Sequence, residues 1–162
     1  MKQTLSLKLK MGEIIYDVQN KTYLTGKSLE NGENHAHVAN VQANDDDENA
    51  AQVLRSITMA AAVLRNRLSE FMGGSASSAT NDIMKETDDV VFTLTMPSNF
   101  NTAVAQTLGE AAHQFIVATA IADWFAITAK GETTDYSVTA EASMKVIEEA
   151  LCKRNRPIRV EE

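Results

Sequence analysis

Glu110 and His113 carry the clearest metal-binding chemistry in the chain, and they lie three positions apart in a helix-forming segment. On a helix this spacing places a carboxylate and an imidazole on one face, as in the carboxylate-ligated helical bundles that bind metal ions. Such a centre needs two copies of the E-x-x-H motif, and this sequence has one. Two hypotheses follow. One is a metal-dependent helical-bundle enzyme that uses Glu110 and His113; the other is a partly buried histidine with an ordinary hydrogen-bond partner.

Two further groups of residues could attract a divalent cation. His35 and His37 flank one alanine, so an extended chain would project both imidazoles to the same side, where a third ligand would still be needed. The acidic run at 45–48 lacks the spaced oxygen ligands and the glycine of a dedicated calcium loop. We interpret it as a solvated segment before a helix, where carboxylates favour the helix dipole and one of residues 44–46 caps the helix.

The remaining candidates favour structural roles. Cys152 is the only cysteine, so no internal disulfide can form, and no histidine lies near it in sequence to activate the thiol. The glycine- and serine-rich stretch 73–78 lacks the lysine of a phosphate-binding loop and is interpreted as a linker. Trp124 and Phe125 belong to an apolar stripe and are expected in the core. We therefore assign no catalytic, cofactor-binding or metal-ligating residue from the sequence and expect no cofactor.

Charge is distributed unevenly along these 162 residues, whose formal net charge is −7. Six acids and no lysine or arginine lie between residues 30 and 48, whereas both ends are basic. The basic residues at the ends are Lys2, Lys8, Lys10, Lys153, Arg154, Arg156 and Arg159. An acidic protein is repelled by nucleic acid and by anionic membranes, so neither is an expected partner. The apolar stretch 115–129 is interrupted by polar residues and is shorter than a membrane helix, and a cytoplasmic location is predicted.

Two segments have the period-two alternation of half-buried strands. In 4–11 the apolar side chains Leu5, Leu7 and Leu9 alternate with polar ones, and 90–96 alternates in the same way before Pro97 ends it. A lone strand leaves its backbone groups unpaired, so the two segments are predicted to form a small antiparallel sheet. Residues 158–160 are a candidate third strand.

Helical periodicity predicts four helices, at 13–26, 48–72, 99–129 and 134–154. A hairpin turning at residues 20–21 is the alternative for the first of them. The third is apolar over more than half of its circumference, so it should be central, and Ser98 is predicted to cap it. Residues 28–47 and 73–88 are expected to be mobile loops. The predicted fold is a single domain over 1–162, in the α+β class but mainly α, with a four-helix bundle-like core.

The two ends of the chain resemble uncharacterised small proteins from phage-like or prophage elements of gut anaerobes. The resemblance lies in Leu-Ser-Leu-Lys-Leu-Lys-Met at 5–11 with the segment 13–26 that follows, and in the closing residues 151–160. It implies a structural component of a virion, of the tail or of the head–tail junction, and therefore a virion-associated location. It carries over no functional residue.

These observations predict a non-enzymatic structural or assembly protein that self-associates or binds other structural proteins. The basic ends could complement an acidic face on a neighbouring copy, an arrangement that sets the register of assembly. The metal-dependent enzyme with Glu110 and His113 remains the first alternative. A regulatory module that binds another protein is the second.

Overall fold

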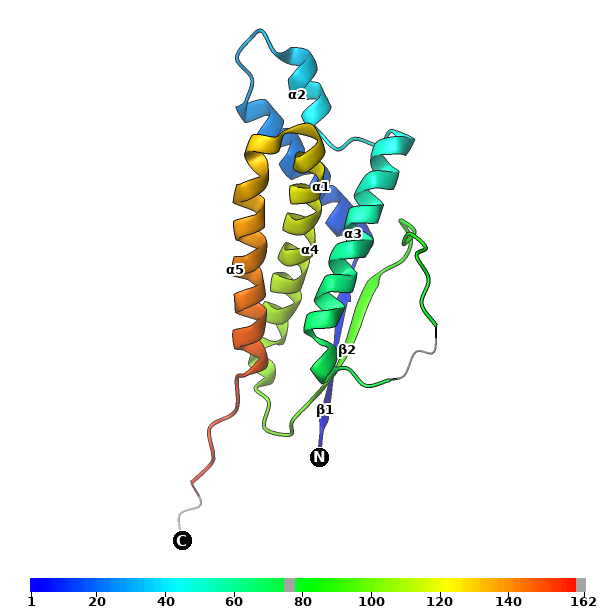
Figure 1. Cartoon of the computed structure of the whole chain (residues 1–162). Helices are drawn as coiled ribbons and strands as arrows, with labels where there is room; N and C mark the ends of the chain where they lie inside the picture. Colours follow the sequence, from blue (N-terminus) through cyan, green and yellow to red (C-terminus); the bar gives the residue numbers. More distant parts are fainter. Residues whose placement is uncertain (75–77, 160–162) are drawn as a thin grey trace.

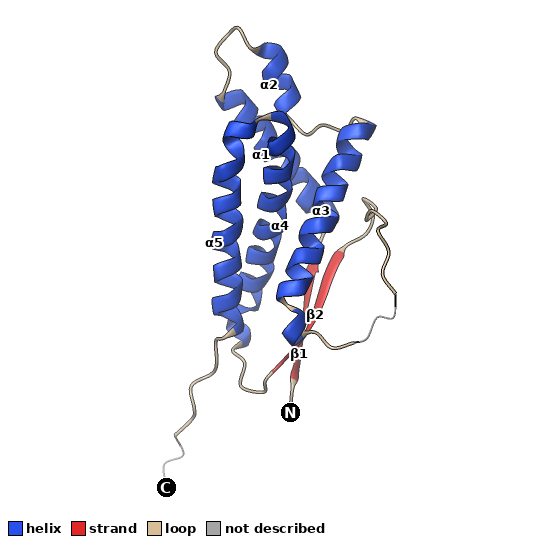
Figure 2. Ribbon diagram, viewed as in Figure 1, coloured by secondary structure: helices blue, strands red, loops and turns tan. Residues whose placement is uncertain are grey.

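Helices account for most of the chain in the computed structural model, which describes residues 1–74 and 78–159 (Figure 1). The elements in chain order are β1 (Gln3–Leu9), α1 (Met11–Ser28), α2 (His35–Val41), α3 (Asp47–Arg67), η1 (Ser69–Phe71), β2 (Val90–Met96), η2 (Thr102–Val104), α4 (Ala105–Thr128), η3 (Lys130–Glu132) and α5 (Thr133–Leu151). Figure 2 shows the strands beside one end of the helical bundle, so the predicted mainly helical α+β class is confirmed.

The two predicted strands pair as expected. β1 and β2 are antiparallel and in continuous register from Gln3 opposite Met96 to Leu9 opposite Val90. Alternation buries every second side chain against the helices and leaves the others exposed. No third strand joins this sheet within the described residues, so the second edge of β1 has no backbone partner. The candidate strand 158–160 is wrong for Ile158 and Arg159, and residue 160 lies outside the described residues.

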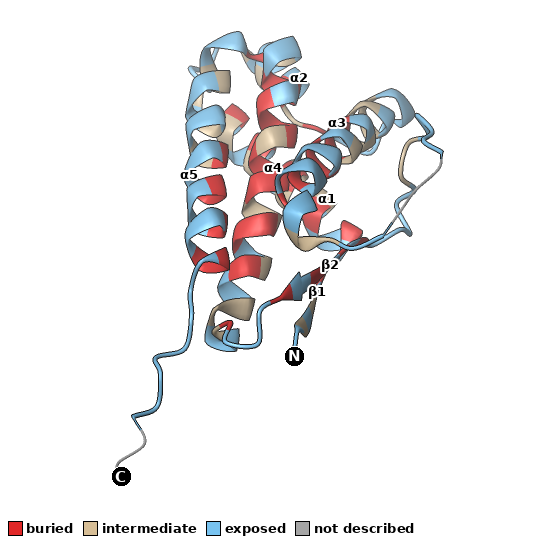
Figure 3. Cartoon of the chain, turned by 60° about the horizontal axis from the view of Figure 1, so that its bottom comes forward, coloured by how far each residue is buried: buried red, intermediate tan, exposed pale blue. Residues whose placement is uncertain are grey.

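α4 is the central helix of the bundle, as its apolar circumference predicted. It packs against α1, α3, α5 and β1, and Figure 3 shows its buried residues spread along its length. Alanines at 111, 112, 118, 120 and 122 are buried, which allows the neighbouring helices to approach closely. Trp124 and Phe125 are buried too, which confirms their placement in the core.

The four predicted helices are present, and their ends differ from the predictions. α1 is continuous from Met11 to Ser28, so the alternative hairpin at residues 20–21 is wrong. Ser98 is not the cap of the central helix. Asn101 caps the short η2 that precedes α4, because its side chain accepts a hydrogen bond from the Ala103 backbone, and α4 itself begins after Val104 without a side-chain cap. The chain before it is instead held to the end of α5 by a bridge between Phe100 and Arg154.

The interpretation of 28–47 as one loop is wrong for its middle, where α2 forms. α2 follows α1 closely, and a Cβ atom added at Gly26 would lie 3.1 Å from the Val38 carbonyl oxygen. Its end is held from two sides: Trp124 Nε1 donates to the Val41 carbonyl at 2.6 Å, and the Thr22 hydroxyl accepts from the Ala43 amide at 3.1 Å. Outside 75–77, the other expected loop, 73–88, contains no helix or strand.

One helical segment of the described chain, Thr102–Thr128, is long and apolar enough to cross a membrane by composition. Its most apolar window is 61% buried inside the bundle. That burial is typical of a core helix, whose apolar surface is covered by its neighbours.

Candidate functional site

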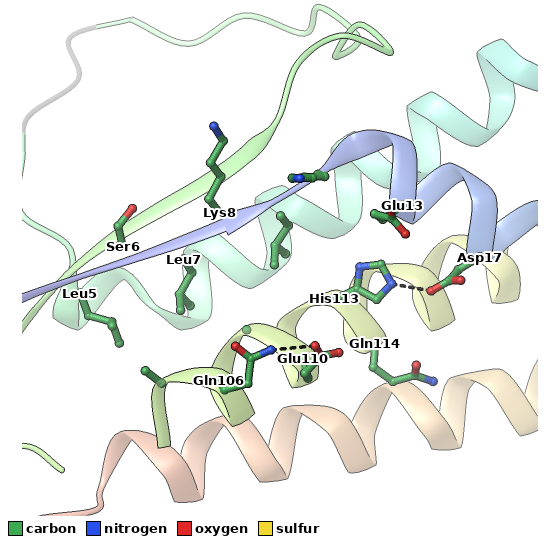
Figure 4. Close-up of a pocket in the computed structure, with 14 residues that line it drawn as sticks. Leu5, Ser6, Leu7, Lys8, Glu13, Asp17, Gln106, Glu110, His113 and Gln114 are labelled. Carbon is green, nitrogen blue, oxygen red and sulfur yellow. Dashed lines mark hydrogen bonds and ion pairs between the residues drawn. The ribbon is translucent and has the colours of Figure 1, made fainter. Parts of the chain in front are cut away.

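A trough of about 680 Å³ opens between the unpaired edge of β1, the first turns of α1 and the N-terminal half of α4. Figure 4 shows Leu5 and Leu7 directed toward α4, while Ser6 and Lys8 point away from it. Polar side chains of both helices line the opposite wall. The volume lies in the usual range for binding sites. A ligand in the trough would therefore contact the backbone of β1 on one side and the side chains of α1 and α4 on the other.

His113 in the trough is bonded to Asp17 of α1. Its Nε2 lies 2.6 Å from Asp17 Oδ2, and the imidazole N–H donates to the carboxylate. The His113 side chain is 18% exposed and that of Asp17 is 34% exposed, so the pair lies at the floor of the trough and fastens α1 to α4. This arrangement matches the hypothesis of a partly buried histidine with a partner.

Glu110 lines the same trough, so the prediction that Glu110 and His113 share one helix face is confirmed. Glu110 is exposed and accepts a hydrogen bond from the Gln106 amide at 2.9 Å. Across the described ranges, no group of three or more His, Cys, Asp or Glu side chains is arranged to hold a metal ion. Sequence reasoning missed Asp17. The one available signal was the i, i+4 spacing of Glu13 and Asp17, which puts two carboxylates on one face of α1.

The structure separates the other acidic and histidine candidates from the trough. His35 and His37 lie on α2 and not on an extended segment, and residues two apart on a helix do not face the same side. His35 Nδ1 is 3.1 Å from Glu30 Oε1. Asp46 occupies the N-cap position of α3 without a side-chain cap bond, and the first turn contains two further acids, as the helix dipole favours.

Cys152 and the carboxylates near it are on the surface at the end of α5. Cys152 is exposed just after α5, and the neighbouring Glu149 pairs with Lys153 at 3.2 Å. Glu148 pairs with Arg67 of α3 at 3.4 Å. Residues 75–77 of the glycine- and serine-rich stretch lie outside the described residues. Cys152, Glu148 and Glu149 do not line the trough.

A second groove, of about 660 Å³, lies between α4 and α5 and shares one wall with the trough. That wall is a ridge on α4 formed by Gln106, Glu110 and Gln114. The groove is more apolar than the trough, and it is lined by the half-exposed or exposed valines Val138 and Val146 of α5. The N-terminal half of α4 is thus accessible on both sides of one ridge.

Asp123 of α4 lies outside both grooves, facing α3. Partial burial raises the pKa of its carboxyl above the ordinary 3.8, and a hydrogen bond from the Ser56 hydroxyl opposes that rise. Ser56 is itself buried. Asp123 keeps one side exposed to solvent, so this polar contact with Ser56 lies at the edge of the α3–α4 packing.

No protein family, no curated protein and no solved structure matches this chain. Function is therefore inferred from the trough and the side chains around it.

Proposed function

We propose that the chain is a non-enzymatic structural subunit that assembles with copies of itself or with other structural proteins. The observation that carries the proposal is the unpaired edge of β1, which opens onto the trough. An exposed strand edge presents a row of N–H and C=O groups that pair readily with another chain. Strand addition at such an edge is a common way to bind a protein segment, with side-chain pockets beside the edge providing specificity.

The polar groups of the trough support an interface. His113 is fixed by Asp17, and Glu110 is held by Gln106 on the outer surface. Side chains held in this way present charge and shape to a partner with little loss of freedom on binding. Beside them, the apolar groove between α4 and α5 extends the accessible surface of the same helix. A protein segment that fills the trough would bury apolar and polar surface together, as interfaces between subunits do.

The resemblance of both chain ends to phage-like proteins supports a virion as the context of assembly, in the tail or at the head–tail junction. In this proposal the chain is made in the host cytoplasm and becomes part of the virion. Subunits of such assemblies form symmetric rings or filaments through repeated contacts.

Gly109 provides a test, because it lines the trough and a Cβ atom added there meets nothing within 4 Å. A Gly109→Trp variant should fold, since replacing a helical glycine removes a flexible residue, and it should fill the trough. We expect the unmodified chain to form oligomers of a 17.7 kDa subunit in sedimentation velocity, with a mass that rises with concentration, and the variant to be monomeric.

Gly12→Trp is the matched control. Gly12 is an exposed glycine of α1 with nothing within 4 Å of an added Cβ atom, and it does not line the trough. This variant should assemble as the unmodified chain does. If the unmodified chain stays monomeric over a wide range of concentrations in low and high salt, assembly with copies of itself is ruled out.

A further inference from the structure

The chain after α5 is an exposed basic tail, which we define as residues 153–159. It runs away from the body of the molecule (Figure 1). Backbone bonds fix its beginning: the Asn155 amide donates to the Asn99 carbonyl at 2.8 Å, and the Asn101 amide donates to the Lys153 carbonyl. Beyond Asn155 the described residues are exposed, and Ile158 is 91% exposed. An apolar side chain between arginines is thus presented to solvent on an extended segment.

The tail is basic, and the lining of the trough has a small excess of acidic side chains. The tail has two lysine or arginine residues at 153 and 154 and two arginines at 156 and 159, and no acid. The carboxylates of Glu13, Asp17 and Glu110 line the trough. Lys8 and Lys10 also border it, but Lys8 points away from α4 and pairs with Asp89 at 3.4 Å. Complementary charge of this kind selects a partner and fixes its register.

The tail is too short for its backbone to reach Glu13 and Asp17 in the trough of its own chain. Asn155 is fastened beside the Gln3 end of β1, because the Gln3 side chain donates to the neighbouring Ser98 carbonyl. Four residue steps from Asn155 reach about 14 Å when fully extended. β1 alone is about 20 Å long, and Glu13 and Asp17 lie beyond its other end. The backbone of a chain's own tail, as far as Arg159, therefore cannot run along the whole of β1 to Glu13 and Asp17, whereas the tail of another copy is under no such restraint.

We infer, building on the proposed function, that the tail of one copy adds as a strand to the β1 edge in the trough of the next. In an extended strand alternate residues direct their backbone groups to the same edge. Arg156 and Ile158 can therefore both pair with β1, which leaves Pro157, without an N–H, on the outer edge where proline is tolerated. In this arrangement Ile158 covers the apolar wall of the trough and Arg156 meets Glu110.

This contact is heterologous, since each copy gives one tail and accepts another at a different surface. Contacts of this type close into rings or extend as filaments. One short tail in one trough is a small interface. Closure of a ring gives every subunit two such contacts, so the assembly is more stable than a single contact would make it.

Two full-length variants separate the tail from the trough. Gly109→Trp blocks the trough and keeps the tail, while Arg156→Glu combined with Ile158→Asp alters the tail and keeps the trough. Circular dichroism establishes that each variant is folded. We expect neither to form oligomers alone in sedimentation velocity, and their mixture to form a one-to-one complex, because each supplies the half that the other lacks.

A charge exchange tests the pairing of Arg156 with Glu110. Glu110→Arg should weaken assembly roughly tenfold, as should Arg156→Glu, and the two changes in one chain should restore most of it. Glu141→Arg is the matched control, because Glu141 is an exposed glutamate on α5 that does not line the trough. It should leave assembly unchanged.

The outcomes distinguish the inference from the proposed function. If the unmodified chain forms oligomers and the tail variants form them equally well, the tail inference fails and the proposed function stands. If the two blocked variants are both monomeric but do not combine, the tail binds elsewhere and the inference fails again. A monomeric unmodified chain overturns the inference and the self-assembly on which it rests.

Discussion

At the scale of single residues, Asp123 is a carboxylate whose ionisation works against folding. Partial burial raises its pKa in the folded chain, so the folded state holds the proton at pH values where the unfolded state has lost it. Its contribution to stability is therefore most favourable below the ordinary pKa of 3.8 and is lost as the pH rises through the raised value. The hydrogen bond from Ser56 lowers the pKa of Asp123, so it makes this loss of stability smaller but does not abolish it.

We expect Asp123→Asn to raise the free energy of unfolding at pH 7, since the amide carries no charge and can still accept from Ser56. The gain should disappear as the pH falls below 3.8, where the aspartate is neutral in both states. Urea unfolding at several pH values measures the difference between the two proteins. Glu141→Gln on the exposed face of α5 is the control, and a larger gain at acidic than at neutral pH would contradict the prediction.

Residue-level prediction from sequence succeeded where the partners lie on one helix. The spacing of Glu110 and His113 fixed their common face, because helix geometry alone decides it. Asp17, which holds His113, comes from a different helix, 96 residues away along the chain. Such a contact depends on how α1 packs on α4, and no local pattern encodes that packing.

At the scale of elements, the sequence predicted the long elements and missed the short one. Strands β1 and β2 and the helices α1, α3, α4 and α5 each contain several repeats of their period, which is enough to define a buried face. α2 has seven residues and one fully buried side chain, Val41, so it has no periodic stripe to detect. It is formed by tertiary contacts, and its place depends on them.

Trp124→Phe should therefore loosen α2 selectively. Phenylalanine fills much of the same space but cannot donate to the Val41 carbonyl, and a buried carbonyl without a partner costs about 1–3 kcal/mol. We expect faster amide hydrogen exchange in α2 than in the unmodified chain, with little change in α5. Equal protection of α2 in the two proteins would show that the Trp124 bond does not hold it.

Trp124→Tyr tests the reason for the change. Its hydroxyl can donate, although from a different position, so partial recovery of protection in α2 would indicate that the hydrogen bond, rather than the volume of the indole, accounts for the loss.

At the scale of the whole molecule, every packing layer meets at α4. The helix contacts α1, α3, α5 and β1, so the sheet, the trough and the bundle share one core. A single shared core favours cooperative unfolding, in which all elements are lost together. The trough keeps its shape for the same reason, because its wall on α4 is part of the element that the rest of the fold surrounds.

Ile116→Ala tests this dependence on α4. Ile116 is fully buried in the middle of the helix, and removing its branched side chain should lower the free energy of unfolding by about 2–5 kcal/mol. Fluorescence of Trp124, the only tryptophan, and circular dichroism of the helices should shift together, because both report on one core. Ile127→Ala, on the same helix at a side chain 61% exposed, should change stability by less than about 1 kcal/mol. If Trp124 fluorescence and circular dichroism report different transitions in the Ile116 variant, parts of the bundle unfold independently. The shape of the trough would then depend on one part of the fold and not on the whole core.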